Sequence, residues 1–291
     1  MHKLVVILGP TASGKSDLAV NLARRFSGEI ISADSRQVYK KLDIGSGKIT
    51  KREMKGIKHH LLSVANPKRK FTVAQYQKLA LQEIKKIQAA GHVPFLVGGT
   101  GFYIQSIVDG ITIPQVSPDW ALRKKLSRYS IERLYEMLKK LDPVRAASID
   151  AKNPVRLIRA IEIVKTTKKP VTPLKTNRQF DVLQIGIRKS PIQLKKLIAA
   201  RLQKRLKKMI VEVKKLHKEG LSWKRLEELG LEYRFVAQYV QHKISKGEMV
   251  QTLQKEIWQY SKRQMTWFRR DLKIHWIKNE KEVKGLIKKF L

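Results

Sequence analysis

The chain has 291 residues, no cysteine, and 62 lysines and arginines against 24 aspartates and glutamates, which leaves a formal net charge of +38. The absence of cysteine excludes disulfides and cysteine-based zinc sites, and no apolar run in the sequence approaches the length that crosses a membrane. A charge of this size repels itself unless a polyanion is bound. The composition therefore favours a nucleic-acid partner whose phosphates provide most of the affinity.

The first predicted element is a buried strand at residues 3–8, an apolar and β-branched run. It leads into GPTASGKS at residues 9–16, which matches the phosphate-binding pattern G-x-x-x-x-G-K-[ST], and residues 17–25 then predict a helix. Backbone amides and a helix N-terminus in this arrangement bind a polyphosphate. The residues that we expect to hold it are Gly9, Thr11, Ala12, Ser13, Gly14, Lys15 and Ser16. Lys15 would neutralise the terminal phosphates, and the Ser16 hydroxyl would be a ligand of Mg²⁺.

The N-terminus predicts no signal peptide, because residues 3–8 form the strand that ends in the phosphate-binding loop. We therefore expect a cytoplasmic protein.

A carboxylate follows the second predicted strand, residues 29–32. Asp34 lies just past its carboxyl end, where ligands of doubly wound sheets bind. It would face the same cleft as the phosphate-binding loop. The alternative is that Asp34 only caps the next turn, since Asp and Ser are good cap residues.

The third predicted strand, residues 93–97, ends in Gly98, Gly99 and Thr100. Nucleotide hydrolases and kinases usually carry an acidic residue there to hold the metal, so this segment argues against a motor-type ATPase. The small residues would let a large substrate group approach the backbone.

The other expected strands are residues 60–64, 181–187 and 273–278. Residues 120–141 and 146–166 predict helices, with breaks at Pro143 and at residues 169–173. Residues 194–216 carry an apolar stripe at helical spacing, which includes Leu197, while lysines and arginines cover the other faces. The expected fold class is α/β, with a P-loop-type core and a mostly parallel sheet flanked by helices.

Residues 1–112 and 181–291 would form this core with its basic helical C-terminal part. Residues 113–180 would form an all-helical insertion domain that binds RNA. A substrate channel would lie between the core and the insertion domain.

Three segments in this order, GPTASGKS, ISADSRQVYK (31–40) and VGGTGFYI (97–104), resemble the tRNA dimethylallyltransferases, also called tRNA isopentenyltransferases. Residues 142–163, 201–209 and 260–271 (YSKRQMTWFRRD) resemble further motifs of that family. The chain departs from the family at Ser46, Ser63 and residues 229–240; the family often has Thr at the first position and commonly has Asp at the second.

This resemblance implies transfer of a dimethylallyl group from dimethylallyl diphosphate to the exocyclic N6 amine of the adenosine 3′ of the tRNA anticodon, with release of diphosphate and with Mg²⁺ as cofactor. Asp34 would be the general base, and Thr100 would orient the amine or Asp34 by a hydrogen bond. Arg201 would be a second diphosphate clamp; its alternative role is a solvated charge on a helix. The adenine would have to be extruded from its stack to react.

Both substrates and the oligomeric state are expected from the same resemblance. The partners would be tRNA, through its anticodon stem-loop, and dimethylallyl diphosphate, and the protein would be a monomer. The residues expected at the tRNA are Asp34, Ser35, Arg36, Gln37, Thr100, Phe102, Arg123, Asn153, Arg156, Arg159, Lys262 and Arg263.

Two other functions remain open from the residues. One is a small-molecule enzyme on the same scaffold, an adenylate isopentenyltransferase or a nucleotide kinase. The large insertion, the basic C-terminal helices and YSKRQMTWF favour RNA over free AMP. The other is a non-catalytic RNA-binding protein with a vestigial phosphate loop, against which the intact Lys15, Ser16, Asp34 and Thr100 argue.

Overall fold

The computed structural model describes residues 2–277 and 280–291. The chain forms two compact units, which we call the core unit (residues 1–110 and 178–291) and the insertion unit (residues 111–177). In the described parts of the chain, no helix combines the length and apolarity that a membrane span needs.

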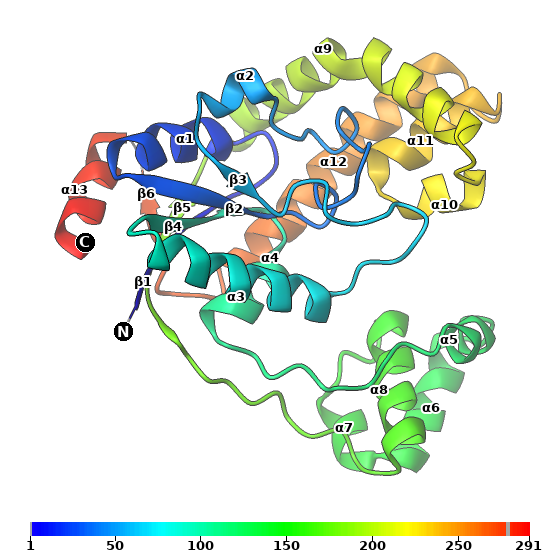
Figure 1. Ribbon diagram of the computed structural model, residues 1–291. Coiled ribbons are helices and arrows are strands. Elements are labelled where there is room, and N and C mark those ends of the chain that lie inside the picture. Colours follow the sequence, from blue (N-terminus) through cyan, green and yellow to red (C-terminus); the bar gives the residue numbers. More distant parts are fainter. Residues whose placement is uncertain (1, 278–279) are drawn as a thin grey trace. The chain divides into compact units, whose positions relative to one another are not determined.

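The core unit is built on a six-stranded sheet with the order β3-β2-β4-β1-β5-β6 (Figure 1). Every pair of neighbouring strands is parallel. The strands are β1 (His2–Leu8), β2 (Gly28–Ala33), β3 (His59–His60), β4 (Val93–Gly98), β5 (Phe180–Ile187) and β6 (His275–Ile277). The predicted fold class, a parallel sheet with flanking helices, is confirmed. Phe180, the last residue of the predicted insertion, is the first residue of β5.

Two predicted strands are shorter than expected. The strand expected at residues 60–64 ends at His60, because Leu61 and Ser63 adopt left-handed backbone conformations with φ of 60° and 58°, which no strand accommodates. The strand expected at residues 273–278 begins at His275. Residue 278 lies outside the described residues.

Helices cover both faces of the sheet (Figure 1). Alternate residues of β1 point to opposite faces: Val5 and Ile7 pack with α1 and α13, whereas Leu4, Val6 and Leu8 belong to the cluster with α3, α4, α9, α11 and α12. The core helices are α1 (Lys15–Arg25), α2 (Lys51–Met54), α3 (Val73–Ala89), α4 (Gly101–Val108), α9 (Pro191–Lys218), α10 (Trp223–Glu228), α11 (Leu231–Val240), α12 (Lys246–Phe268) and α13 (Glu280–Phe290).

The long helix α9 confirms the apolar stripe predicted for residues 194–216. Its buried positions are Leu194, Ile198, Leu202, Leu206, Met209, Val213 and Leu216. Leu197 was assigned to the stripe wrongly, because its side chain is 42% exposed. The buried stripe holds α9 on the core unit and leaves its neighbouring faces for Arg201 and Glu212.

The insertion unit contains four helices, α5 (Trp120–Leu126), α6 (Ile131–Leu141), α7 (Pro143–Ser148) and α8 (Pro154–Thr167). The sequence predicted two longer ones, and each is divided by a helix start that local side chains stabilise. Ser130 accepts the Arg133 amide at the start of α6, and Asn153 accepts the Arg156 amide at the start of α8. The predicted break at Pro143 is confirmed: α6 ends at Leu141, and Pro143 is the first residue of α7, after the cap residue Asp142.

Candidate active site

The loop between β1 and α1 has the backbone geometry of a phosphate cradle. Gly9, Ala12 and Gly14 have positive φ angles of 157°, 61° and 88°. A Cβ atom on Gly9 would lie 3.0 Å from both the Ile187 carbonyl oxygen and Ser13 Oγ. Only glycine fits this close approach, and successive amides in such a turn point inward and bind anions.

Ser13 is a buried hydroxyl inside this loop. Its side chain is 3% exposed, and Ser13 Oγ has no hydrogen-bond partner among the described residues. Buried hydroxyls in folded proteins nearly always have a partner. Ser13 therefore offers a hydrogen bond that a ligand in the loop would complete.

Positive charge converges on the loop from two elements. Lys15 Nζ donates to the Pro10 carbonyl oxygen at 3.2 Å, and Arg201 on α9 donates to Thr11 Oγ1 at 3.4 Å and to the Gly47 carbonyl oxygen at 3.3 Å. Burial and the neighbouring Arg201 lower the pKa of Lys15 to about 8, although Asp34 acts in the opposite direction. Two cations held this close favour an anion between them.

Arg205 is a third cation here, and the sequence did not single it out. Burial first, and then Arg201 one turn away, lower its pKa. Its Nη2 atom is buried and has no partner among the described residues. Glu232 and Glu212 act on the Arg205 pKa in the opposite direction, so it is Lys15 and Arg201 that form the cationic cluster beside the loop.

Asp34 and Thr100 lie together at the carboxyl ends of β2 and β4. Asp34 Oδ1 accepts the backbone amides of Arg36 at 2.8 Å and Gln37 at 3.3 Å, so the carboxylate does cap the turn. Thr100 Oγ1 accepts the Ser35 amide at 3.0 Å. Thr100 thus holds the backbone beside Asp34, whereas the sequence predicted a bond to the carboxylate or to the substrate amine.

Two tyrosines line this part of the site. Burial, and then the Asp34 charge, raise the pKa of Tyr260 on α12. Tyr103 stacks on Tyr76 with ring centroids 3.9 Å apart, and burial raises its pKa as well. Both hydroxyls are therefore neutral at physiological pH.

The glycines after β4 serve a purpose that the sequence did not predict. A Cβ atom on Gly99 would overlap Gln264 Nε2, and one on Gly101 would overlap the indole ring of Trp267. The small residues therefore admit side chains of α12 to the backbone, and the prediction that they admit a substrate group is corrected.

The predicted tRNA contacts divide between the two units. In the insertion unit, Arg123 Nε donates to Glu162 at 2.8 Å, and Arg159 also pairs with Glu162, which is fully buried. Arg156 lies 3.7 Å from Asp150, and Asn153 caps α8. These four side chains already stabilise the insertion unit by these contacts.

In the core unit, the remaining predicted contacts lie near the site or on the exposed side of α12. Phe102 packs edge-on against Trp267, with centroids 6.3 Å apart. Lys262 and Arg263 are both exposed. Lys262 lies over the ring of Trp258 and Arg263 over the ring of Tyr260, each 5.9 Å from the ring centroid.

The two serines at which the chain departs from the family both take part in hydrogen bonds. Lys48 Nζ, whose side chain is 6% exposed, donates to Ser63 Oγ at 2.7 Å and pairs with Asp43 at 2.6 Å. The Ser46 amide donates to the Tyr233 hydroxyl at 3.1 Å. Polar contacts with Ser63 and Tyr233 therefore help to hold the loop of residues 43–48.

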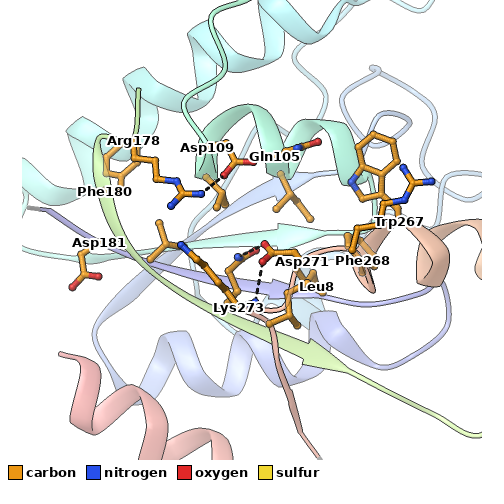
Figure 2. Close-up of a pocket in the computed structure, with 17 residues that line it drawn as sticks. Leu8, Gln105, Asp109, Arg178, Phe180, Asp181, Trp267, Phe268, Asp271 and Lys273 are labelled. Atoms are coloured by element: carbon orange, nitrogen blue, oxygen red, sulfur yellow. Dashed lines mark hydrogen bonds and ion pairs between the residues drawn. The ribbon is translucent and has the colours of Figure 1, made fainter. Parts of the chain in front are cut away.

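A separate cleft of about 530 Å³ lies in the core unit between β5, α4 and the end of α12 (Figure 2). Two polar pairs line it, Asp109 with Arg178 at 3.1 Å and Gln184 with Asp271 at 2.6 Å. Its lining includes neither Lys15 nor Asp34. The site described above is defined by converging polar groups and not by this cleft.

Residues 37–271 match the family model described as IPP transferase. The chain is 38% identical to a tRNA dimethylallyltransferase of Carboxydothermus hydrogenoformans, over 97% of this chain and 93% of the relative. It is 41% identical to a tRNA dimethylallyltransferase of Syntrophus aciditrophicus, over 96% of this chain and 95% of the relative. The crystal structure of the full-length tRNA isopentenylpyrophosphate transferase from Bacillus halodurans matches with a TM-score of 0.73 and 34% identity, over 98% of this chain and 94% of that one. The chain belongs to the IPP transferase family.

Proposed function

We propose that this enzyme transfers a dimethylallyl group from dimethylallyl diphosphate to the exocyclic N6 amine of the adenosine 3′ of the anticodon in tRNA, and releases diphosphate. The relatives named tRNA dimethylallyltransferase match this chain over nearly their whole length. The observation that carries the proposal is that Asp34 follows β2 and the phosphate-binding loop follows β1, and that parallel strands end at one edge of the sheet. The effect of Asp34 on the pKa of Lys15 agrees with this arrangement.

The cationic cluster would act on the leaving group. As the bond between the allylic carbon and the diphosphate oxygen breaks, its electron pair remains on the diphosphate, where negative charge grows. Lys15, Arg201 and those backbone amides of the phosphate-binding loop that have no partner within the protein would stabilise that charge. Preorganised donors of this kind make a large contribution to catalysis.

Asp34 would act on the nucleophile. The adenine N6 nitrogen forms the new bond to the allylic carbon and gives one proton to the Asp34 carboxylate, which is held in place by the Arg36 and Gln37 amides. These bonds occupy Oδ1 and orient the carboxylate. A positioned general base contributes about 10²–10⁴-fold to the rate.

Mg²⁺ is the metal proposed for the diphosphate. No group of three or more His, Cys, Asp or Glu side chains in the described residues could hold a metal ion, which suits Mg²⁺, an ion that takes few protein ligands and completes its shell with substrate phosphates and water. The Ser16 hydroxyl, in the first turn of α1 beside the loop, is the side chain that would bind it. Bound there, the ion would add positive charge beside the diphosphate.

Transfer of label tests the proposal directly. The protein is incubated with labelled dimethylallyl diphosphate and Mg²⁺, together with either tRNA or AMP, and with tRNA in which the adenosine 3′ of the anticodon is replaced by guanosine. We expect label only on the tRNA that has adenosine at the position 3′ of the anticodon. Label on AMP but not on tRNA would select an adenylate isopentenyltransferase, and RNA binding without transfer would select a non-catalytic protein.

A further inference from the structure

Gln264 lies between the two halves of the site, and neither its sequence position nor the family match assigns it a role. Its side chain is buried, with 6% exposed. Oε1 accepts the Thr11 backbone amide at 2.9 Å, and Nε2 donates to the Gly99 carbonyl oxygen at 2.8 Å. The orientation of the amide is determined, because an N–H can only donate and a carbonyl can only accept.

The two backbone groups that Gln264 joins belong to different functional parts. Thr11 is in the phosphate-binding loop, and its hydroxyl also accepts from Arg201. Gly99 directly precedes Thr100, which holds the backbone of Ser35 beside Asp34. Gln264 therefore spans from the anion site to the segment that carries the general base.

The backbone around Gln264 is shaped to receive it. Gly99 has no side chain, and a Cβ there would overlap Gln264 Nε2. The φ angle of Gly99 is not in the left-handed region, so the only close contact of an alanine side chain at this position would be with Gln264 Nε2. The neighbouring turns of α12 are fixed by the buried Phe268 and Ser261.

From these contacts we infer that Gln264 is a positioning residue that sets the spacing between the diphosphate site and the Asp34–Thr100 segment for prenyl transfer. This inference rests on the proposed function. Transfer requires the allylic carbon, held by its diphosphate, to meet the amine, held near Asp34. A displacement of about 1 Å between such partners can cost about 10²-fold in rate.

Two substitutions remove the clamp in different ways. Gln264→Met keeps length and flexibility but makes neither hydrogen bond. Gly99→Ala leaves Gln264 intact but displaces its amide. Gln251→Met is the matched control, since Gln251 is exposed on the same helix. For each variant we would measure kcat with tRNA, the Kd of dimethylallyl diphosphate, the Kd of tRNA and the Tm.

We expect kcat to fall about 10²-fold in Gln264→Met and in Gly99→Ala, with both Kd values within about threefold of wild type, and with Gln251→Met unchanged. Because both changes break one clamp, the double variant should lose no more than the more severe single variant. A wild-type kcat in a folded Gln264→Met protein, additive losses in the double variant, or Kd values that weaken as much as kcat would each overturn the inference. Wild-type protein that transfers nothing to tRNA would instead overturn the proposed function, and this inference with it.

Discussion

Asp34 caps a turn and is also the proposed general base. One oxygen receives two backbone amides, which fixes the direction of the carboxylate. Asparagine retains an acceptor oxygen for those amides but cannot take a proton at neutral pH. We expect Asp34→Asn to lower kcat by about 10²–10⁴-fold and to leave the Kd of tRNA nearly unchanged, as measured by steady-state transfer and by filter binding.

The same change at an exposed aspartate, Asp181→Asn on β5, is the control for Asp34→Asn and should have no effect on kcat. A near-normal rate in Asp34→Asn would show that Asp34 only caps its turn.

Glu29 is a buried carboxylate far along β2 from this site. Ring nitrogens of His60 and His92 lie 2.7 Å from its oxygens, and Lys58 lies at 3.3 Å. Burial alone would raise the pKa of Glu29, but these hydrogen bonds outweigh it and hold the pKa below its ordinary value of 4.5. The stabilisation is therefore complete above pH 4.5 and is lost as the pH falls through the folded-state value.

Glu29→Gln should lower the free energy of unfolding by about 1–3 kcal/mol at pH 7, since it weakens hydrogen bonds to a buried charge. Urea titrations from pH 7 to pH 3 should show the gap between variant and wild type narrowing below pH 4.5. A gap of constant size would contradict this account.

At the scale of elements, α9 both supplies Arg201 and anchors the loop of residues 43–48. The Glu212 carboxylate accepts the amides of Asp43 at 2.9 Å, Ile44 at 2.6 Å and Gly45 at 2.9 Å, and the Tyr233 hydroxyl at 2.8 Å. Successive amides that converge on an anion form a nest. The anchored loop presents the Gly47 carbonyl oxygen to Arg201.

Glu212→Gln should therefore lower the free energy of unfolding by about 2–3 kcal/mol, because hydrogen bonds to charged groups contribute about that much. Chemical denaturation would measure it. Glu219→Gln, at the residue that follows α9, removes only the charge of a surface pair with Lys41, so the free energy of unfolding should stay nearly unchanged. Equal losses in the two variants would mean that the loop does not depend on Glu212.

For the whole molecule, the decisive quantity is the net charge of +38. Binding of a tRNA releases counterions, so its affinity should fall steeply with salt. If Lys262 and Arg263 each contact a phosphate, Lys262→Ala and Arg263→Ala should each flatten the slope of log Kd against log salt by about one. Fluorescence anisotropy at several salt concentrations measures the slope.

Lys288→Ala is the control for the salt dependence, because it removes the same charge from the exposed side of α13. An equal flattening in Lys288→Ala would show that Lys262 and Arg263 contribute only general charge.

Local sequence patterns determined much of this protein. The P-loop lies between a strand and a helix because an apolar run, glycines and an amphipathic run follow each other directly. The expected places of Asp34 and Thr100 at strand ends follow from the same logic, since parallel strands end at one edge of the sheet. The stripe of α9 was predictable from its period, apart from Leu197.

Other features depend on residues far apart in the chain, and no local pattern encodes them. Gln264 meets Thr11 across 253 positions and Gly99 across 165. The role of Gly99 was therefore assigned to the substrate from sequence, although α12 fills the space. Arg123 and Arg159 remain predicted RNA contacts, but no local pattern encodes the partner that they share, the buried Glu162.

A phosphate cradle and a strand-end carboxylate could be predicted from the sequence, because each needs only a few neighbouring residues with the right backbone freedom. Only the tertiary structure decided how these groups are held in register. That support comes from side chains of α9 and α12, two helices whose apolar faces belong to the same core cluster as the sheet and which lie far from the loops in sequence.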